Sequence, residues 1–86
     1  MTLYSKTLTA SGEIAGAFSV EEILPVALSF ITSDMTATLQ RSLDEGVNWV
    51  EVETFSASAA RNVEGPGQYR VLATSAGTAT VQVLRG

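Results

Sequence analysis

The sequence predicts an all-β fold, a small antiparallel β-sandwich or barrel of about seven to eight short strands. Three observations carry this prediction. No apolar pattern of helical period continues for more than one turn. Threonine, valine and aromatic residues recur in short runs that glycine, proline, asparagine and aspartate separate. The last run alternates strictly, with Ala79, Val81 and Val83 on one face and polar residues on the other.

The strands are placed by the apolar runs and by the turn signals between them, which are SGEIAG, SDM, DEG, EGPG and SAG. Helical character is conceivable at 20–24 alone, and Pro25 ends it because proline lacks the N–H that a helix interior needs. The expected strands are 3–9, 17–21, 26–32, 36–43, 48–55, 59–63, 69–74 and 78–84.

Aromatic side chains are expected inside, because a domain this small needs its largest apolar groups in the core. In the run at 69–74, alternation turns Tyr69 and Val71 inward and Arg70 outward. The aromatic residues assigned to the core are Tyr4, Phe18, Phe30 and Phe55.

The composition favours docking or oligomerisation. The 86 residues (9.0 kDa) are expected to form a single all-β domain over 1–86. Charged residues make up 16% of the chain, against about 25% in ordinary soluble domains. Hydrophobic residues make up 45% and mean hydropathy is +0.22, so serine, threonine and alanine must supply much of the surface. Such a surface loses its water at low cost.

Several functions are disfavoured by what the sequence lacks. The net charge is −4 and the five basic residues are scattered, which argues against nucleic-acid binding. With no cysteine and no histidine, we expect no disulfide, no metal site, no cofactor and no catalysis. The apolar run at 23–31 is too short for a membrane span, and the start lacks the apolar stretch of a signal peptide. The expected location is the cytoplasm, or a particle assembled there.

The most patterned segment is RSLDEGVNW, residues 41–49, which reads S-x-D-x-G-x-x-W from Ser42. An aspartate accepts hydrogen bonds from the amides of its own turn, and a glycine supplies the positive φ that closes such a loop. Asp44 and Gly46 therefore predict a hairpin turn, to which Ser42 adds a side-chain hydrogen bond.

The loop length decides which face each side chain takes. A three-residue loop places Trp49 on the face of Leu39 and Leu43, together with both nearby glutamates. A four-residue loop at 44–47 instead groups Leu39, Leu43, Val50 and Val52 inside, and places Trp49 outside with Gln40, Ser42, Glu51 and Glu53. We prefer the four-residue loop because it keeps both glutamates in water. It also puts Arg41 on the inner face, at the rim with its head in solvent.

Two interpretations of Trp49 follow from this register. As an outer residue it is a candidate interface anchor. The preferred alternative is that its ring folds over its own hairpin as a local apolar cluster.

The four residues Ser42, Asp44, Gly46 and Trp49 resemble the Asp-box hairpin of sialidase-type propellers and of unrelated secreted or virion β-domains. In those families the motif is a structural turn remote from the chemistry. Propellers carry several copies, whereas this chain has one, so the resemblance implies a turn and no sialidase activity.

A broader resemblance covers about residues 36–86. The succession of TLQRSLDEGVNWVEVETF, VEGPGQYRVLAT and GTATVQVLRG is similar to small bacteriophage virion proteins. It implies a non-enzymatic accessory protein of the virion, assembled in the host cytoplasm. Its partners would be other virion proteins, the major capsid protein first, and it would form a homo-oligomer, with a trimer favoured.

Within that class, head decoration ranks above tail or head–tail attachment. A carbohydrate-binding β-sandwich that stacks Trp49 or Tyr69 on sugar rings is the alternative from another class. The candidate interface comprises Trp49 and the start of the first strand, where the N-terminal segment 2–9 would reach a neighbour. The interface residues in this first strand are Thr2, Leu3 and Tyr4.

Two carboxylate groupings are considered and set aside. Glu51 and Glu53 share a strand face at a spacing that a glycosidase pair tolerates, but nothing in the sequence indicates a cleft. Asp34, Asp44, Glu45 and Glu64 lack the spacing of a calcium loop.

Overall fold

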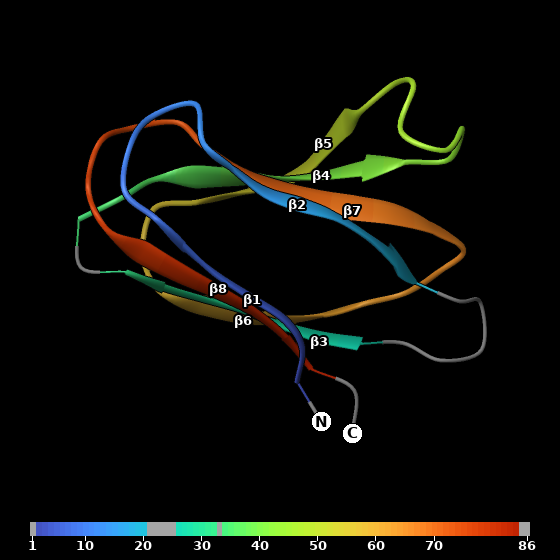
Figure 1. The fold of residues 1–86 in the computed structure, drawn as a ribbon, viewed down its shortest axis with the longest axis horizontal. Coiled ribbons are helices and arrows are strands. Elements are labelled where there is room, and N and C mark those ends of the chain that lie inside the picture. The colour runs from blue at the N-terminus through green and yellow to red at the C-terminus, as the bar shows by residue number, and fades with distance from the viewer. Residues whose placement is uncertain (1, 21–25, 33, 85–86) are drawn as a thin grey trace.

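The chain folds into eight β-strands in the part that its computed structural model describes, residues 2–20, 26–32 and 34–84 (Figure 1). Side chains are described for these residues except 2, 3 and 17. The strands are β1 (Thr2–Leu8), β2 (Ile14–Val20), β3 (Val26–Thr32), β4 (Ala37–Ser42), β5 (Val50–Phe55), β6 (Ala59–Val63), β7 (Gly67–Ala73) and β8 (Ala79–Leu84).

The strands form two four-stranded sheets, in the orders β1-β8-β3-β6 and β2-β7-β4-β5. All the pairings are antiparallel. The two sheets lie face to face in Figure 1, so the fold is a β-sandwich and not a closed barrel. This confirms the all-β prediction and selects the sandwich. The strands at the sheet edges are β1, β6, β2 and β5.

The core lies between the sheets and is built by alternation along each strand. In β8, Ala79, Val81 and Val83 are buried while the residues between them are more exposed. Phe30 and Phe55 meet in the interior with ring centroids 5.4 Å apart. Tyr4 and Phe18 are half-buried against this core. The predicted core aromatics thus lie inside or at its margin, and Tyr69 and Val71 point inward as predicted.

One flank of the sandwich is closed by side chains that link β1 to β2. A register shift between Ala15 and Phe18 interrupts the β2–β7 ladder. The Gly16 amide then donates to the Tyr4 hydroxyl at 2.7 Å, and Lys6 Nζ donates to the Ile14 carbonyl at 2.8 Å. These bonds satisfy two backbone groups of the edge strand β2 with side chains from β1.

The strand predictions agree with the structure to within two residues, except at the start of the second strand. That second strand begins at Ile14, three residues before the predicted start at 17, because Ile14 and Ala15 pair with Leu72 and Val71. The helical character considered at 20–24 lies outside the described residues except for Val20, which ends β2.

Candidate functional site

The β4–β5 turn is organised by the side chains of Ser42 and Asp44. Ser42, almost fully buried, donates its hydroxyl to Asp44 Oδ1 at 2.7 Å and accepts from the Gly46 amide at 2.9 Å. Asn48 donates its backbone amide to Asp44 Oδ1 at 2.9 Å and its side-chain amide to Oδ2 at 2.7 Å. Both carboxylate oxygens are therefore used in closing the turn.

The backbone of the turn passes through the left-handed region at two consecutive residues. Glu45 has φ 62° and Gly46 has φ 87°. A Cβ at Gly46 would lie 3.1 Å from Gln68 Oε1 and 3.6 Å from Trp49 Cζ2. Glycine at this position thus provides both the conformation and the room for the Gln68 side chain.

The hydrogen bonds to Asp44 favour its ionised form. The backbone amide of Asn48, then the Ser42 hydroxyl and the Asn48 side chain, lower the pKa of Asp44 from 3.8 to about 2. An ionised aspartate with both oxygens engaged is part of the turn and is poorly placed for proton transfer.

Trp49 lies over its own hairpin on the outer side of β4. Its indole Nε1 donates to the Gly46 carbonyl at 3.1 Å, and the ring is half-buried. The guanidinium carbon of Arg70 lies 4.3 Å from the centroid of the Trp49 ring, and Arg70 Nε donates to Gln40 Oε1 at 2.7 Å. The structure thus brings Ser42, Asp44, Gly46 and Trp49 into one turn, and the described contacts of Trp49 are those of the local cluster.

Next to the turn, the strand pairing is the one expected for the four-residue loop at 44–47. Arg41 pairs with Val50 and Gln40 pairs with Glu51. The register then shifts, so that Leu39 pairs with Glu53 and Val52 is the extra residue of a β-bulge in β5.

The bulge corrects the prediction that both glutamates face outward. Glu51 remains outside, but Glu53 turns to the inner side and accepts two hydrogen bonds from Arg61 Nε, at 2.9 and 3.0 Å, and one from Nη2 at 2.6 Å. This hydrogen-bonded contact with Arg61 lowers the pKa of Glu53. The two carboxylates are therefore on opposite sides of β5, and Glu53 joins the two sheets on the flank opposite β1 and β2.

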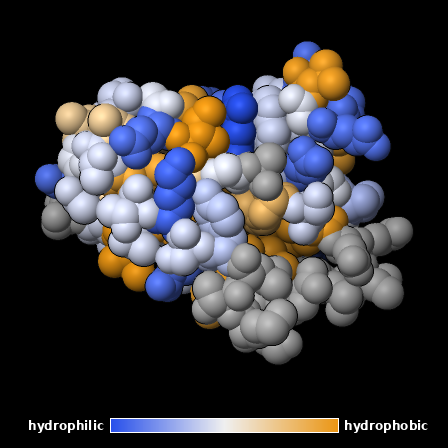
Figure 2. Space-filling model, in the orientation of Figure 1, coloured by the Kyte–Doolittle hydropathy of each residue, from blue (hydrophilic) through white to orange (hydrophobic). Residues whose placement is uncertain are grey.

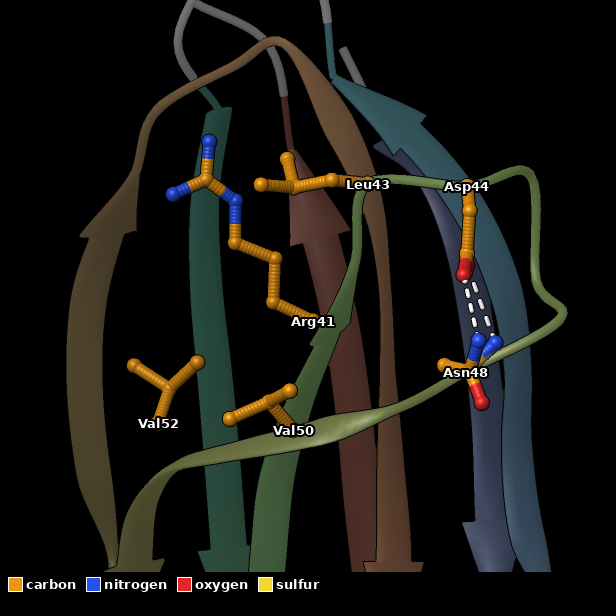
Figure 3. Close-up of a pocket in the computed structure, with 6 residues that line it drawn as sticks. All are labelled: Arg41, Leu43, Asp44, Asn48, Val50 and Val52. Atoms are coloured by element: carbon orange, nitrogen blue, oxygen red, sulfur yellow. Dashed lines mark hydrogen bonds between the residues drawn. The ribbon is translucent and has the colours of Figure 1, made fainter.

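The inner apolar group of the hairpin is exposed, contrary to the prediction. Leu39 is buried, but Leu43 is 74% exposed, Val50 67% and Val52 54%. These three side chains lie on the same side as Arg41 (Figure 3). The hairpin projects away from the other sheet at this end of the molecule (Figure 1), so nothing in the described chain covers them.

The exposed residues line a pocket of about 390 Å³. Its walls are Leu43, Val50 and Val52 with the stem of Arg41, and Asp44 and Asn48 lie at the turn end (Figure 3). Figure 2 shows hydrophobic atoms at the projecting tip of the hairpin, where Val47 is 76% exposed.

Arg41 points inward, as predicted, but its head is not simply in solvent. Its Nη2 donates to the Pro66 carbonyl at 2.7 Å, and its guanidinium carbon lies 5.6 Å from the Tyr69 ring centroid. The guanidinium is thus directed toward the β6–β7 connection.

The outward face of the β1-β8-β3-β6 sheet has a uniform character. Ser29 is at its centre, paired with Gln82 on one side and Ala60 on the other. Among the described residues that the register turns outward here, none carries a charge. They are Ser5, Thr7, Ala27, Ser29, Ile31, Ala60, Asn62, Thr80, Gln82 and Leu84, and we call this surface the neutral face.

The predicted N-terminal interface segment is an edge strand of its own domain. From Thr2 to Leu8 it pairs with β8, with a register shift between Thr2 and Tyr4. Thr2 and Leu3 are placed by their backbone alone, and the hydroxyl of Tyr4 is engaged by Gly16. Any contact of β1 with a neighbour would therefore use its free edge or its outward side chains.

The sequence did not single out several residues that complete these sites. Asn48 stands inside the S-x-D-x-G-x-x-W motif, so its place two residues after Gly46 was an available signal. Trp49 contacts Arg70, and Glu53 contacts Arg61. Both arginines come from later strands, and no local sequence pattern identifies them as partners.

The described residues hold no cluster of three or more acidic side chains placed to bind a metal ion. They also include no helix with the length and apolarity needed to cross a membrane.

Comparison with known proteins bears on the fold alone. No protein-family model matches the chain, and no curated protein matches it in sequence. Among solved structures, the chain is similar to one in the crystal structure of Drosophila melanogaster CENP-C bound to CAL1, with a TM-score of 0.62 at 6% identity. That match covers 95% of this chain and 62% of the other.

A second similar structure is the Yersinia pseudotuberculosis-derived mitogen, with a TM-score of 0.51 at 17% identity, covering 93% of this chain and 79% of that one. At these identities the two likenesses show a shared β-sandwich architecture and nothing further.

Proposed function

We propose that this chain is a non-enzymatic structural protein of a bacteriophage virion, and that it decorates the head by docking on the major capsid protein. The observation that carries the proposal is the neutral face, together with the likeness of residues 36–86 to small virion proteins. The cores of protein interfaces are depleted in charged residues, because each buried charge must be desolvated. Serine, threonine and alanine on a sheet avoid that cost.

The size of the neutral face favours an oligomer over single docking. Four strands about 4.8 Å apart, each about 20 Å long, present about 400 Å². A standard interface buries about 800 Å² on each partner. One face is therefore small for stable attachment, whereas a trimer bound at several points gains by multivalency.

Tail or head–tail attachment would use the same surface and remains the alternative within the virion class. A carbohydrate-binding role has less support. Tyr69 is only 4% exposed, and Arg70 lies over the Trp49 ring, where a sugar would have to stack.

Quantitative mass spectrometry of phage particles tests this function. Particles would be induced from the source cells and purified on a caesium chloride gradient. We expect this chain in the particle band at a copy number close to that of the major capsid protein. A copy number of a few per particle would move it to the tail, and its absence from the particle band would overturn the virion proposal.

A further inference from the structure

The pocket on the β4–β5 hairpin is independent of the neutral face and lies at the opposite sheet. Exposed aliphatic side chains are concentrated here: among the described residues, the large hydrophobic side chains that are exposed are Leu43, Val47, Val50, Val52 and, elsewhere, Ile31. Leu43, Val50 and Val52 share one pocket of about 390 Å³. That volume is within the range of sites that bury a ligand.

The pocket runs beside a strand edge that is open to a partner. β5 is the edge of its sheet, and β4 is its neighbour on the other side. Side chains of β1 cover the β2 edge, whereas β5 is held to the opposite sheet through Glu53 and Arg61. The bulge at Val52 limits strand pairing, so side-chain insertion must supply most of the binding energy.

The charged side chains around the pocket are mainly acidic, which favours a basic partner over a second copy of this chain. Residues 37–55 hold the carboxylates of Asp44, Glu45 and Glu51 against the guanidinium of Arg41, while the carboxylate of Glu53 is paired with Arg61 of β6. That guanidinium is turned to the Pro66 carbonyl. A second copy of β5 would bring like-charged glutamates together across the contact, which is unfavourable.

We propose that this pocket captures an extended segment of another protein in which aliphatic residues alternate with lysine or arginine. The aliphatic side chains enter between Leu43, Val50 and Val52. The basic side chains meet Glu51 on the opposite side of the strand and the acidic turn at 44–45. The alternation follows from the period of an extended chain, whose successive side chains point to opposite faces.

Fluorescence anisotropy with a short fluorescein-labelled peptide of alternating lysine and valine tests the site. We expect saturable binding that weakens as salt is raised. Val50→Thr and Val52→Thr should each weaken it about tenfold, because a hydroxyl replaces a methyl group in the apolar contact while strand propensity is kept. Glu51→Lys should weaken binding severalfold at low salt.

Val47→Thr is the matched control, since Val47 is a still more exposed valine of the same hairpin that does not line the pocket. It should change affinity by less than about twofold. Three results would each overturn the inference: equal losses in Val47→Thr and Val52→Thr, tighter binding of a glutamate–valine peptide, or no binding of the lysine–valine peptide. Self-association that Val52→Thr abolishes would also overturn it, because the occupant would then be a second copy. Particle composition would be unaffected by any of these results.

Discussion

At the residue scale, the ionisation of Asp44 in the β4–β5 turn makes the stability of the fold depend on pH. Its pKa is lowered from 3.8 to about 2 by hydrogen bonds from the Asn48 amide, Ser42 and the Asn48 side chain. A group whose pKa is lower in the folded state stabilises the fold fully above its unfolded pKa, and that contribution is lost as pH falls through the folded value. The contribution of Asp44 is therefore complete above about pH 4 to 5 and fades toward pH 2.

Asp44→Asn removes this charge while keeping the shape of the side chain. We expect its melting temperature to be below that of the wild type at pH 7, and the gap to close between pH 4 and pH 2. Circular dichroism melts at these pH values measure the gap. Glu45→Gln, which removes the neighbouring carboxylate and none of the hydrogen bonds to Asp44, is the matched control. A gap for Asp44→Asn that is constant down to pH 2 would contradict the role given to this carboxylate.

At the scale of elements, Trp49 and Arg70 connect the hairpin to β7. The guanidinium carbon lies 4.3 Å from the ring centroid, a cation–π distance worth about 0.5 to 1 kcal/mol at a partly exposed site. A double-mutant cycle with Trp49→Leu and Arg70→Met, followed by urea unfolding, should give a coupling energy of that size. Additive losses from the two substitutions would mean that the contact does not stabilise the hairpin.

Most strands could be predicted from the sequence, because local alternation and turn residues specify them. Residues 26–32 and 59–63 are strands as expected, since each run is bounded by turn-favouring residues such as Pro25 and Ser58 and pairs with its neighbour. The turn was predictable for the same reason, since Ser42, Asp44 and Gly46 act within five residues of each other.

The face of Glu53 was not predictable from its neighbours. Strict alternation in VEVE puts both glutamates on one side, but the bulge at Val52 reverses the second. Arg61, which receives Glu53, belongs to the other sheet and is brought there only by the folded chain. Likewise, the exposure of Val50 depends on where the opposite sheet ends, which no local pattern encodes.

At the scale of the whole molecule, the two proposed binding surfaces lie on different sheets. The neutral face belongs to the β1-β8-β3-β6 sheet, and the apolar pocket with its acidic surroundings belongs to the other. A charge placed at the centre of the neutral face should block docking on the capsid, because it would have to be desolvated on contact. Ser29 is that centre, since it pairs with both Gln82 and Ala60.

Absolute mass by light scattering across a dilution series is the most direct test of the oligomer that multivalent docking through the neutral face requires. We predict a closed oligomer, with a trimer favoured, that persists on dilution and that Ser29→Lys leaves intact, because each neutral face is directed at the capsid. A wild-type chain of 9.0 kDa at every concentration, or an oligomer that Ser29→Lys dissociates to the monomer, would contradict this account.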